Sequence, residues 1–281
     1  VDGNDLLAVF HAVRQAAEEV RKRPRPIILE FKTFRMRGHE EASGTKYYPE
    51  GLIDHWGQID PVERFTEWML AQALLTASDM EALRATHKST IEHGLKFAAA
   101  EPAIVADVAT ELADRFAPVP VSSLSDPSPS PQRELRMIDA IQEGLGQAME
   151  RHDNLVLMGQ DIADYGGVFK VTEGFIDRFG KDRVRNTPLC ESAIVGAALG
   201  LSIAGKKAMM EMQFSDFVTV GFNQIVNNLA KIHWRWGQAA DVVVRMPTGG
   251  NVGAGPFHSQ SIEAWFFHVP GLKIVYPSTP E

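Results

Sequence analysis

The sequence predicts an α/β protein with a mostly parallel sheet flanked by helices, in two halves joined by a linker. Strand-like and helix-like segments alternate through residues 134–281, which is typical of a parallel sheet. Residues 117–133 are rich in proline and serine, a composition of linkers rather than of cores. The balance of 44% hydrophobic and 23% charged residues is ordinary for a globular protein, so both halves can fold.

Charge and composition exclude several classes of partner. A net charge of -8 argues against a nucleic-acid partner, which usually requires a basic surface. The longest uncharged apolar run, 192–205, is too short to span a bilayer, so no membrane partner is expected. The single cysteine excludes an internal disulfide framework, and neither a CxxC nor an HExxH pattern predicts a metal site. A reducing compartment is the simplest interpretation.

The first half begins with a helix that Asn4 or Asp5 can cap. Its apolar side chains recur at helical spacing, namely Leu6, Phe10, Val13, Ala17 and Val20. Pro24 ends the helix, and the run Pro-Ile-Ile-Leu-Glu-Phe at 26–31 predicts a buried strand. An irregular segment rich in glycine, histidine and charge follows at 35–58.

Two capping signals predict further helices in this half. Residues 60–63, Asp-Pro-Val-Glu, combine a capping residue with proline at the first helical position and glutamate at the third. Residues 78–81, Ser-Asp-Met-Glu, form a second capping signal that opens a helix towards Ala100. Neither helix carries an obvious catalytic pattern, so a packing role is expected.

The second half predicts elements in alternation. They are a helix at 134–150, a strand at 154–158, a helix from 191, a strand at 208–212, a helix at 217–236, and strands at 242–245 and 272–276. Ligand sites in such sheets lie at the carboxyl ends of the strands. Functional side chains are therefore expected in the loops that follow the strands.

Glu191 is a carboxylate at the start of an apolar helix, with no basic residue within five positions. It could simply complement the partial positive charge of the helix N-terminus. With Thr187 as the cap and Pro188 as the first helical residue, however, Glu191 lies one position past a capping box. A carboxylate in this alanine- and glycine-rich setting needs a hydrogen-bond donor, which favours an active site.

Three other positions have both a structural and a functional interpretation. His258 lies in the glycine-rich loop Gly253-Ala-Gly-Pro-Phe-His-Ser-Gln-Ser and is either a surface residue or a catalyst. His39, flanked by both signs of charge, is either a solvated loop residue or a functional one. Phe217, at the start of a helix, either packs in the core or supports a flat heterocycle.

Taken together, the motifs resemble the thiamine-diphosphate-dependent decarboxylating component of 2-oxo acid dehydrogenase complexes. Residues 1–116 resemble the C-terminal part of its α subunit, in the motifs Val1-Asp-Gly-Asn-Asp, Pro26-Ile-Ile-Leu-Glu, Thr33-Phe-Arg, Gly38-His and Asp60-Pro. Residues 134–281 resemble the pyrimidine-binding domain of its β subunit, in the motifs Gly166-Gly-Val-Phe-Lys, Phe179-Gly-Lys-Asp-Arg-Val, Asn186-Thr-Pro-Leu-Cys-Glu, Glu211-Met-Gln-Phe-Ser-Asp-Phe, His258-Ser-Gln-Ser and Val269-Pro-Gly. The motif ending at Glu191 favours the branched-chain type.

The resemblance implies a transketolase-like fold that binds thiamine diphosphate. It also implies oxidative decarboxylation of a 2-oxo acid, either a branched-chain one or pyruvate, with acetoin left open. The acyl group would pass to the lipoyl group of a partner dihydrolipoyl acyltransferase. The family normally divides α and β between two polypeptides, so this chain resembles a fusion trimmed at both ends. We expect a homodimer or a higher assembly, in the bacterial cytoplasm or, in a eukaryote, in the mitochondrial matrix.

In the family, the residue matching Glu191 bonds a ring nitrogen of the cofactor's aminopyrimidine. It thereby favours the tautomer that removes a proton from the thiazolium carbon, and the resulting ylide attacks the 2-oxo acid. By the same match, Phe217 stacks on the pyrimidine, while Leu189 and Gln213 line the pocket. Partial burial of Glu191 would keep a proton shared between the carboxylate and the pyrimidine.

The resemblance also assigns the two histidines and limits what the chain supplies. His39 matches a histidine near the cofactor, and His258 matches one that gives a proton as the acyl group passes to lipoyl sulfur. The family's diphosphate and Mg²⁺ motif is absent from the sequence. We therefore expect the Mg²⁺ ligands upstream of Val1, none in this chain, and no activity of the chain alone. Glu40 replaces the serine that kinases phosphorylate in some relatives, so this control is not expected.

Two alternatives remain open. A transketolase-like carbon transfer could use the same fold, although the His258 motif and the α-like half argue against it. A non-catalytic scaffold could retain the fold without the cofactor. Binding of thiamine diphosphate by the whole protein would count against the scaffold.

Overall fold

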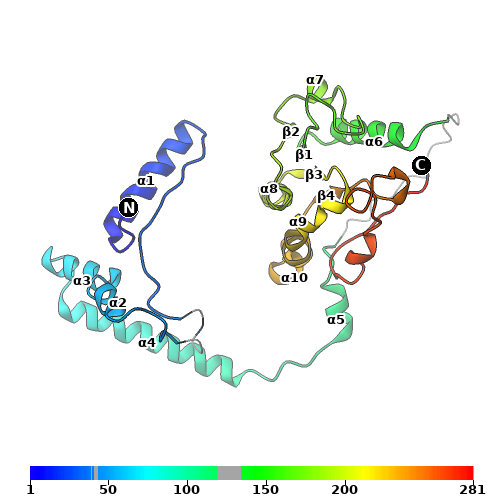
Figure 1. Cartoon of the computed structure of the whole chain (residues 1–281). Helices are drawn as coiled ribbons and strands as arrows, with labels where there is room; N and C mark the ends of the chain where they lie inside the picture. The colour runs from blue at the N-terminus through cyan, green and yellow to red at the C-terminus, as the bar shows by residue number, and fades with distance from the viewer. Residues whose placement is uncertain (39, 41–43, 119–133, 281) are drawn as a thin grey trace. The chain divides into compact units, whose positions relative to one another are not determined.

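The computed structural model describes residues 1–38, 40, 44–118 and 134–280. These divide into two compact units, Val1–Ile104 and Val105–Glu281, labelled here unit 1 and unit 2 (Figure 1). His39 lies outside the described residues, and so does the predicted linker 117–133 apart from its first two residues. No described helix is long and apolar enough to cross a membrane.

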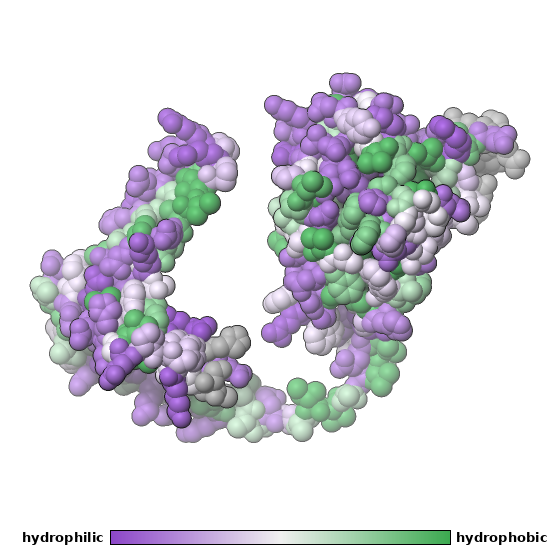
Figure 2. All heavy atoms as spheres, viewed as in Figure 1, coloured by the Kyte–Doolittle hydropathy of each residue, from purple (hydrophilic) through white to green (hydrophobic). Residues whose placement is uncertain are grey.

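Unit 1 is helical. Its helices are α1 (Leu6–Lys22), α2 (Leu52–Gly57), α3 (Pro61–Ala71) and α4 (Ala77–Ala100). The helix α1 contains no buried residue, and its apolar side chains Leu6, Phe10, Val13 and Val20 are exposed or nearly half-exposed. Figure 2 shows apolar residues along this part of unit 1.

The prediction of a buried strand at 26–31 is wrong, because this segment does not pair into a sheet. The segment is extended and runs beside α1 (Figure 1), and together they line a hollow of about 360 Å³. Its residues alternate between half-buried and exposed, with Ile28 94% exposed. A strand requires a ladder of hydrogen bonds to a neighbour, and here the only described bridge is a parallel one between Asp2 and Lys32. The period of two is present, but the segment packs on a helix instead of joining a sheet.

The helix starts of unit 1 follow local chemistry. Asp5 caps α1 by accepting a hydrogen bond from the Ala8 backbone, and Asp60 caps α3 with proline at its first position, as predicted. The cap of α4 differs, because Thr76 and Asp79 form the capping box instead of residues 78 and 81. The helix therefore begins at Ala77.

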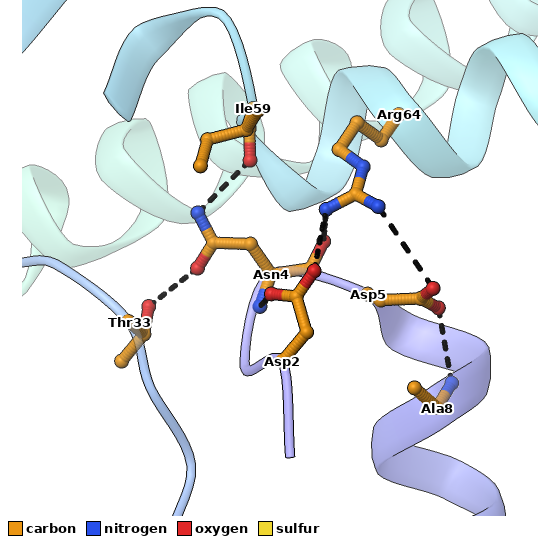
Figure 3. Close-up of polar contacts among 7 residues, drawn as sticks. All are labelled: Asp2, Asn4, Asp5, Ala8, Thr33, Ile59 and Arg64. Atoms are coloured by element: carbon orange, nitrogen blue, oxygen red, sulfur yellow. Dashed lines mark hydrogen bonds and ion pairs between the residues drawn. The ribbon is translucent and has the colours of Figure 1, made fainter. Parts of the chain in front are cut away.

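A buried asparagine ties three segments of unit 1 together (Figure 3). Asn4 is 4% exposed; its amide donates to the Ile59 carbonyl at 2.9 Å and accepts from the Thr33 hydroxyl at 2.6 Å. Beside it, Arg64 Nη1 contacts the Asp2 carboxylate at 3.1 Å. The start of α1, the segment at Thr33 and the α2–α3 junction are thus joined by hydrogen bonds of one buried amide.

Unit 2 is a four-stranded parallel sheet with helices on both faces, in the order β2-β1-β3-β4. Its strands are β1 (Leu155–Gly159), β2 (Val184–Asn186), β3 (Lys207–Glu211) and β4 (Val242–Arg245). Its α-helices are α5 (Val108–Ala113), α6 (Met137–Arg151), α7 (Phe175–Phe179), α8 (Glu191–Ile203), α9 (Val218–Asn223) and α10 (Ile232–Trp236). Short helical turns are η1 (Ser215–Phe217), η2 (Gln224–Leu229), η3 (Gly250–Val252) and η4 (Glu263–Phe266).

Two hydrophobic clusters cover the two faces of the sheet. Met158 and Met210 point to the face covered by α8 and α9, whereas Leu157 and Met209 point to the face covered by α6 and α7. All five residues of β1 are buried, as expected for a central parallel strand. The predicted α/β class is confirmed.

Two predicted elements of unit 2 differ in the structure. The single helix expected at 217–236 is divided into η1, α9, the π-helical turn η2 and α10. The strand expected at 272–276 is extended but unpaired, with Leu272 and Ile274 packed on the core and Val275 82% exposed. The other predicted helices and strands are present with ends shifted by up to three residues, while the short β2 was not predicted.

Candidate functional site

The candidate site lies where the four parallel strands end. The last residues of β2, β1, β3 and β4 are paired in a row, namely Asn186, Gly159, Glu211 and Arg245. The segments that leave this edge carry most of the side chains predicted to be functional. This position agrees with the rule that open parallel sheets bind ligands at their carboxyl ends.

Glu191 is the first residue of α8, and Cys190 is the N-cap. The predicted cap at Thr187 is wrong, because the Thr187 backbone N–H bonds the Gly159 carbonyl at 2.9 Å and so continues the strand edge. Half-buried at a helix N-terminus, the Glu191 carboxylate is favoured by the helix dipole. Gln160 Nε2 donates to Glu191 Oε1 at 3.1 Å.

Two buried polar atoms have no hydrogen-bond partner among the described residues, one on Gln160 and one on Thr187, four positions before Glu191. They are the Gln160 side-chain oxygen Oε1 and the Thr187 hydroxyl. Gln160 is only 5% exposed, so its carbonyl oxygen has little access to water. A buried polar atom without a partner costs about 1–3 kcal/mol. A ligand with ring nitrogens and an amino group, such as an aminopyrimidine, fits this set of a carboxylate and unpaired acceptors.

A buried ion pair that was not predicted lies at the ends of β3 and β4. Arg245 Nη2 contacts Glu211 Oε2 at 2.8 Å, and the two side chains are 17% and 3% exposed. The loop after β1 closes over this pair at Gly167, where φ is +77° and a Cβ atom would lie 3.3 Å from Glu211 Oε1. The sequence carried one signal for this ion pair: Glu211 and Arg245 are charged residues that each end an apolar strand.

Phe217 and His258 contact each other in the structure. They are 41 positions apart, and the sequence did not predict this contact. The imidazole of His258 lies with its ring centroid 5.3 Å from that of Phe217 and 5.1 Å from that of Phe214, edge-on to both. Phe169 packs edge-on against Phe214 at 5.6 Å. Phe169 and Phe214 were not among the predicted site residues. The only signal for them in the sequence was their place close after a predicted turn motif and a predicted strand, respectively.

The remaining candidates differ in their placement. Gln213 Nε2 donates to Asp161 Oδ2 at 3.4 Å, so Gln213 contacts the segment after β1 that also carries Gln160, the partner of Glu191. Leu189 is 80% exposed, so unit 2 does not pack it against the other candidates. His39 lies outside the described residues.

The described residues of this site do not include a cluster of metal-ligating side chains. Within the described ranges, no group of three or more histidine, cysteine, aspartate or glutamate side chains could hold a metal ion. A groove of about 610 Å³ in unit 2 is lined by Asn154 and Lys206, which precede β1 and β3, and so lies towards the opposite edge of the sheet. The candidate site is therefore defined by its polar and aromatic side chains.

Comparisons with known proteins agree with this geometry. Residues 133–281 match the family described as transketolase, pyrimidine binding domain, and residues 1–106 match the family described as dehydrogenase E1 component. The pyruvate dehydrogenase E1 component subunit beta of Leifsonia xyli is 44% identical over 160 residues, which cover 56% of this chain and 47% of that protein. The 2-oxoisovalerate dehydrogenase subunit beta of Bacillus subtilis is 46% identical over 147 residues, which cover 51% of this chain and 44% of that protein.

A third relative has the same pattern. The 3-methyl-2-oxobutanoate dehydrogenase subunit beta of Mycobacterium tuberculosis is 43% identical over 173 residues, covering 61% of this chain and 49% of that protein. The chain therefore spans about half the length of the curated relatives it matches.

Proposed function

Because the chain belongs to the transketolase pyrimidine-binding-domain family and carries a dehydrogenase E1 component segment, we propose that it serves in the oxidative decarboxylation of a 2-oxo acid with thiamine diphosphate. The named substrates of its relatives are pyruvate and branched-chain 2-oxo acids, so we propose a substrate of one of these two kinds. The acyl product would pass reductively to the lipoyl group of a dihydrolipoyl acyltransferase partner.

The observation that carries this proposal is the setting of Glu191. Its carboxylate begins a helix at the carboxyl edge of the sheet and accepts a hydrogen bond from Gln160, whose buried carbonyl oxygen has no partner among the described residues. When bound, thiamine diphosphate supplies an electron sink for the carbon that loses carbon dioxide. Glu191 would hold a proton at the aminopyrimidine ring nitrogen, and the helix N-terminus would stabilise the carboxylate as that proton moves.

The aromatic cluster supports two further roles. Phe217 would support the flat pyrimidine, with Gln213 and Leu189 at the margin of the pocket. His258, half-buried between two aromatic rings, would act as a general acid and supply a proton as the acyl group passes to lipoyl sulfur. His39 would act beside the same cofactor.

Assembly, metal and location are proposals that rest on the family alone. In the family, histidines of the His39 type and carboxylates of the Glu191 type serve one cofactor, so we propose a paired assembly with residues 117–133 as the linker between 1–116 and 134–281. Mg²⁺ would accompany the diphosphate, and no residue of this chain is assigned to it. We propose a cytoplasmic location if the protein is bacterial and a mitochondrial-matrix location if it is eukaryotic.

One experiment tests the proposed function. The full-length protein should bind thiamine diphosphate and decarboxylate 2-oxoisovalerate or pyruvate when an artificial electron acceptor replaces the lipoyl partner. Failure to bind the cofactor would support a scaffold instead. Transfer of a two-carbon unit from a ketose phosphate, without decarboxylation, would support the transketolase-like alternative.

A further inference from the structure

His258 lies on a loop whose backbone is anchored on both sides of it. Gln260, two positions later, donates from its backbone N–H and from Nε2 to Asp216 Oδ1, at 3.2 and 3.0 Å. Asp216 is only 7% exposed and directly precedes Phe217. On the other side, the His258 backbone N–H bonds the Gly255 carbonyl at 3.3 Å. The backbone of this loop is therefore held without any contribution from the imidazole.

Within the described residues, the imidazole is oriented by aromatic rings instead of hydrogen bonds. Neither of its ring nitrogens has a hydrogen-bond partner among those residues. Phe214 and Phe217 lie nearly perpendicular to it, with interplanar angles of 85° and 86° and centroid distances of 5.1 and 5.3 Å. Aromatic pairs in this arrangement contribute about 0.5–1.5 kcal/mol beyond the area they bury. Two such rings thus fix the plane of the imidazole and leave both of its nitrogens available.

Phe214 is the ring that all members of the cluster share. Besides His258, it contacts Phe217 at 6.0 Å and Phe169 at 5.6 Å, with interplanar angles of 89° and 75°. Phe169 comes from the segment after β1, whereas Phe214 comes from the segment after β3. Replacing Phe214 therefore removes a contact from each of the three other rings.

We propose that Phe214 is a positioning residue for His258, and that its ring holds the imidazole in the orientation needed for acyl transfer. This inference rests on the proposed function, in which His258 is the general acid. It adds a residue that was not among the predicted site residues.

The transfer step explains why the orientation of the imidazole matters. As the acyl carbon bonds one lipoyl sulfur, the S–S bond breaks and the second sulfur takes up a proton, which His258 supplies. The two electrons that reduce the disulfide come from the carbon that lost carbon dioxide. A proton donor is effective only within hydrogen-bond reach of its acceptor, so a rotated imidazole slows this step.

The test uses variants of the full-length protein, namely Phe214→Leu, Phe214→Tyr, Phe169→Leu, His258→Ala and the double variant Phe214→Leu/His258→Ala. Phe179→Leu is the matched control. Phe179 is also half-buried and lies at 83° and 5.5 Å to Phe175, but in the hydrophobic cluster on the sheet face covered by α6 and α7. Three quantities are measured: acyl transfer to a lipoyl domain, decarboxylation with an artificial electron acceptor, and the plane of the His258 imidazole in crystal structures.

Phe214→Leu should lower the ratio of acyl transfer to decarboxylation by about 10–100-fold, because a misplaced catalytic group costs up to about 100-fold. Phe214→Tyr keeps a ring of the same size and should restore most of this ratio. Phe169→Leu leaves Phe214 in place but removes one of its neighbours, so the ratio should fall less.

Two comparisons locate the effect at His258. The double variant should be no slower in acyl transfer than His258→Ala, because Phe214 acts through His258. The imidazole should leave its wild-type plane in Phe214→Leu and keep it in Phe179→Leu, whose ratio should also match that of the wild-type protein.

The outcomes separate this proposal from the proposed function. Equal losses of the two rates in Phe214→Leu, or an imidazole that keeps its plane, would overturn the positioning role and leave the general-acid role of His258 intact. Losses that multiply in the double variant would also count against it. If Phe214→Tyr is no better than Phe214→Leu, the requirement for a ring fails. If His258→Ala keeps wild-type acyl transfer, the proposed role of His258 fails and the positioning role fails with it.

Discussion

The buried ion pair between Glu211 and Arg245 allows a quantitative prediction about stability. In Arg245→Met, the methionine fills much of the volume of the arginine stem but leaves the Glu211 carboxylate, 3% exposed, without its 2.8 Å partner. Removing one member of a buried pair typically costs about 3–5 kcal/mol, because the other charge stays in a poorly solvated place. We expect a loss of this size in the free energy of unfolding.

The expected shift in melting temperature follows from the size of unit 2. Each 1 kcal/mol lowers Tm by about 2–4 °C in a domain of roughly 150–250 residues, and unit 2 is in this range. Arg245→Met should therefore lower Tm by about 6–20 °C. The double variant Glu211→Met/Arg245→Met should recover much of the loss, since apolar replacement of both partners is often neutral.

Thermal unfolding followed by far-ultraviolet circular dichroism measures this effect. The control is Arg185→Met, which breaks an exposed contact to Asp182 at 3.5 Å between side chains that are 54% and 86% exposed. Such surface pairs contribute about 0–1 kcal/mol, so this control should melt near the wild-type temperature. Equal Tm values for Arg245→Met and Arg185→Met would refute the reasoning from burial.

Three other predictions concern chemistry and pH. Glu191→Gln should leave the fold intact and slow proton exchange at the thiazolium carbon by about 10²–10⁴-fold, the usual contribution of a positioned acid-base group; a pure helix-terminus charge would cost about 0.3–1 kcal/mol of stability and leave exchange unchanged. His258→Ala should largely keep decarboxylation with an artificial acceptor and lose acyl transfer to a lipoyl domain, and equal losses in both assays would contradict its role as the general acid. The Asn4 backbone N–H and then the Arg64 side chain lower the pKa of Asp2 below 3.8, so its stabilising contribution should be present above that value and disappear as pH falls through the lower folded pKa. Urea unfolding should show Asp2→Asn less stable than wild type at about pH 6 and equal to it once the pH is below the folded pKa; a difference independent of pH would contradict this assignment.

Local patterns in the sequence predicted some of the helix starts correctly and misplaced others. The cap at Asp60 was identified, and Asp5 was one of two candidates for the first cap, because a capping bond joins residues two or three positions apart. Glu191 was placed at the start of its helix, although its cap was assigned three positions too early. That error came from Thr187, whose backbone bonds β1 instead of starting a helix turn. Competition from the sheet edge cannot be seen in a window of a few residues.

Contacts between distant segments were beyond the sequence. The segment at 26–31 has the alternating pattern of a strand. A strand forms only if a neighbouring strand pairs with it, and the pattern of one segment does not identify that neighbour. The bond from Gln160 to Glu191 spans 31 positions and the Arg245–Glu211 pair spans 34. The fold class predicted that such residues meet at one edge of the sheet, while the choice of partners required the register of the strands.

The strand order of unit 2 has a consequence for synthesis on the ribosome. The apolar strand β1 is made first, yet both of its neighbours, β2 and β3, come later in the chain. The wait for β3 is about 50 residues, which at ~5–20 residues per second is several seconds. Throughout this interval the edge of β1 that pairs with β3 stays open, even after β2 has been made on the other side. An open edge on an apolar strand invites association between nascent chains. The nascent protein should therefore be a client of ribosome-associated chaperones until β3 is complete.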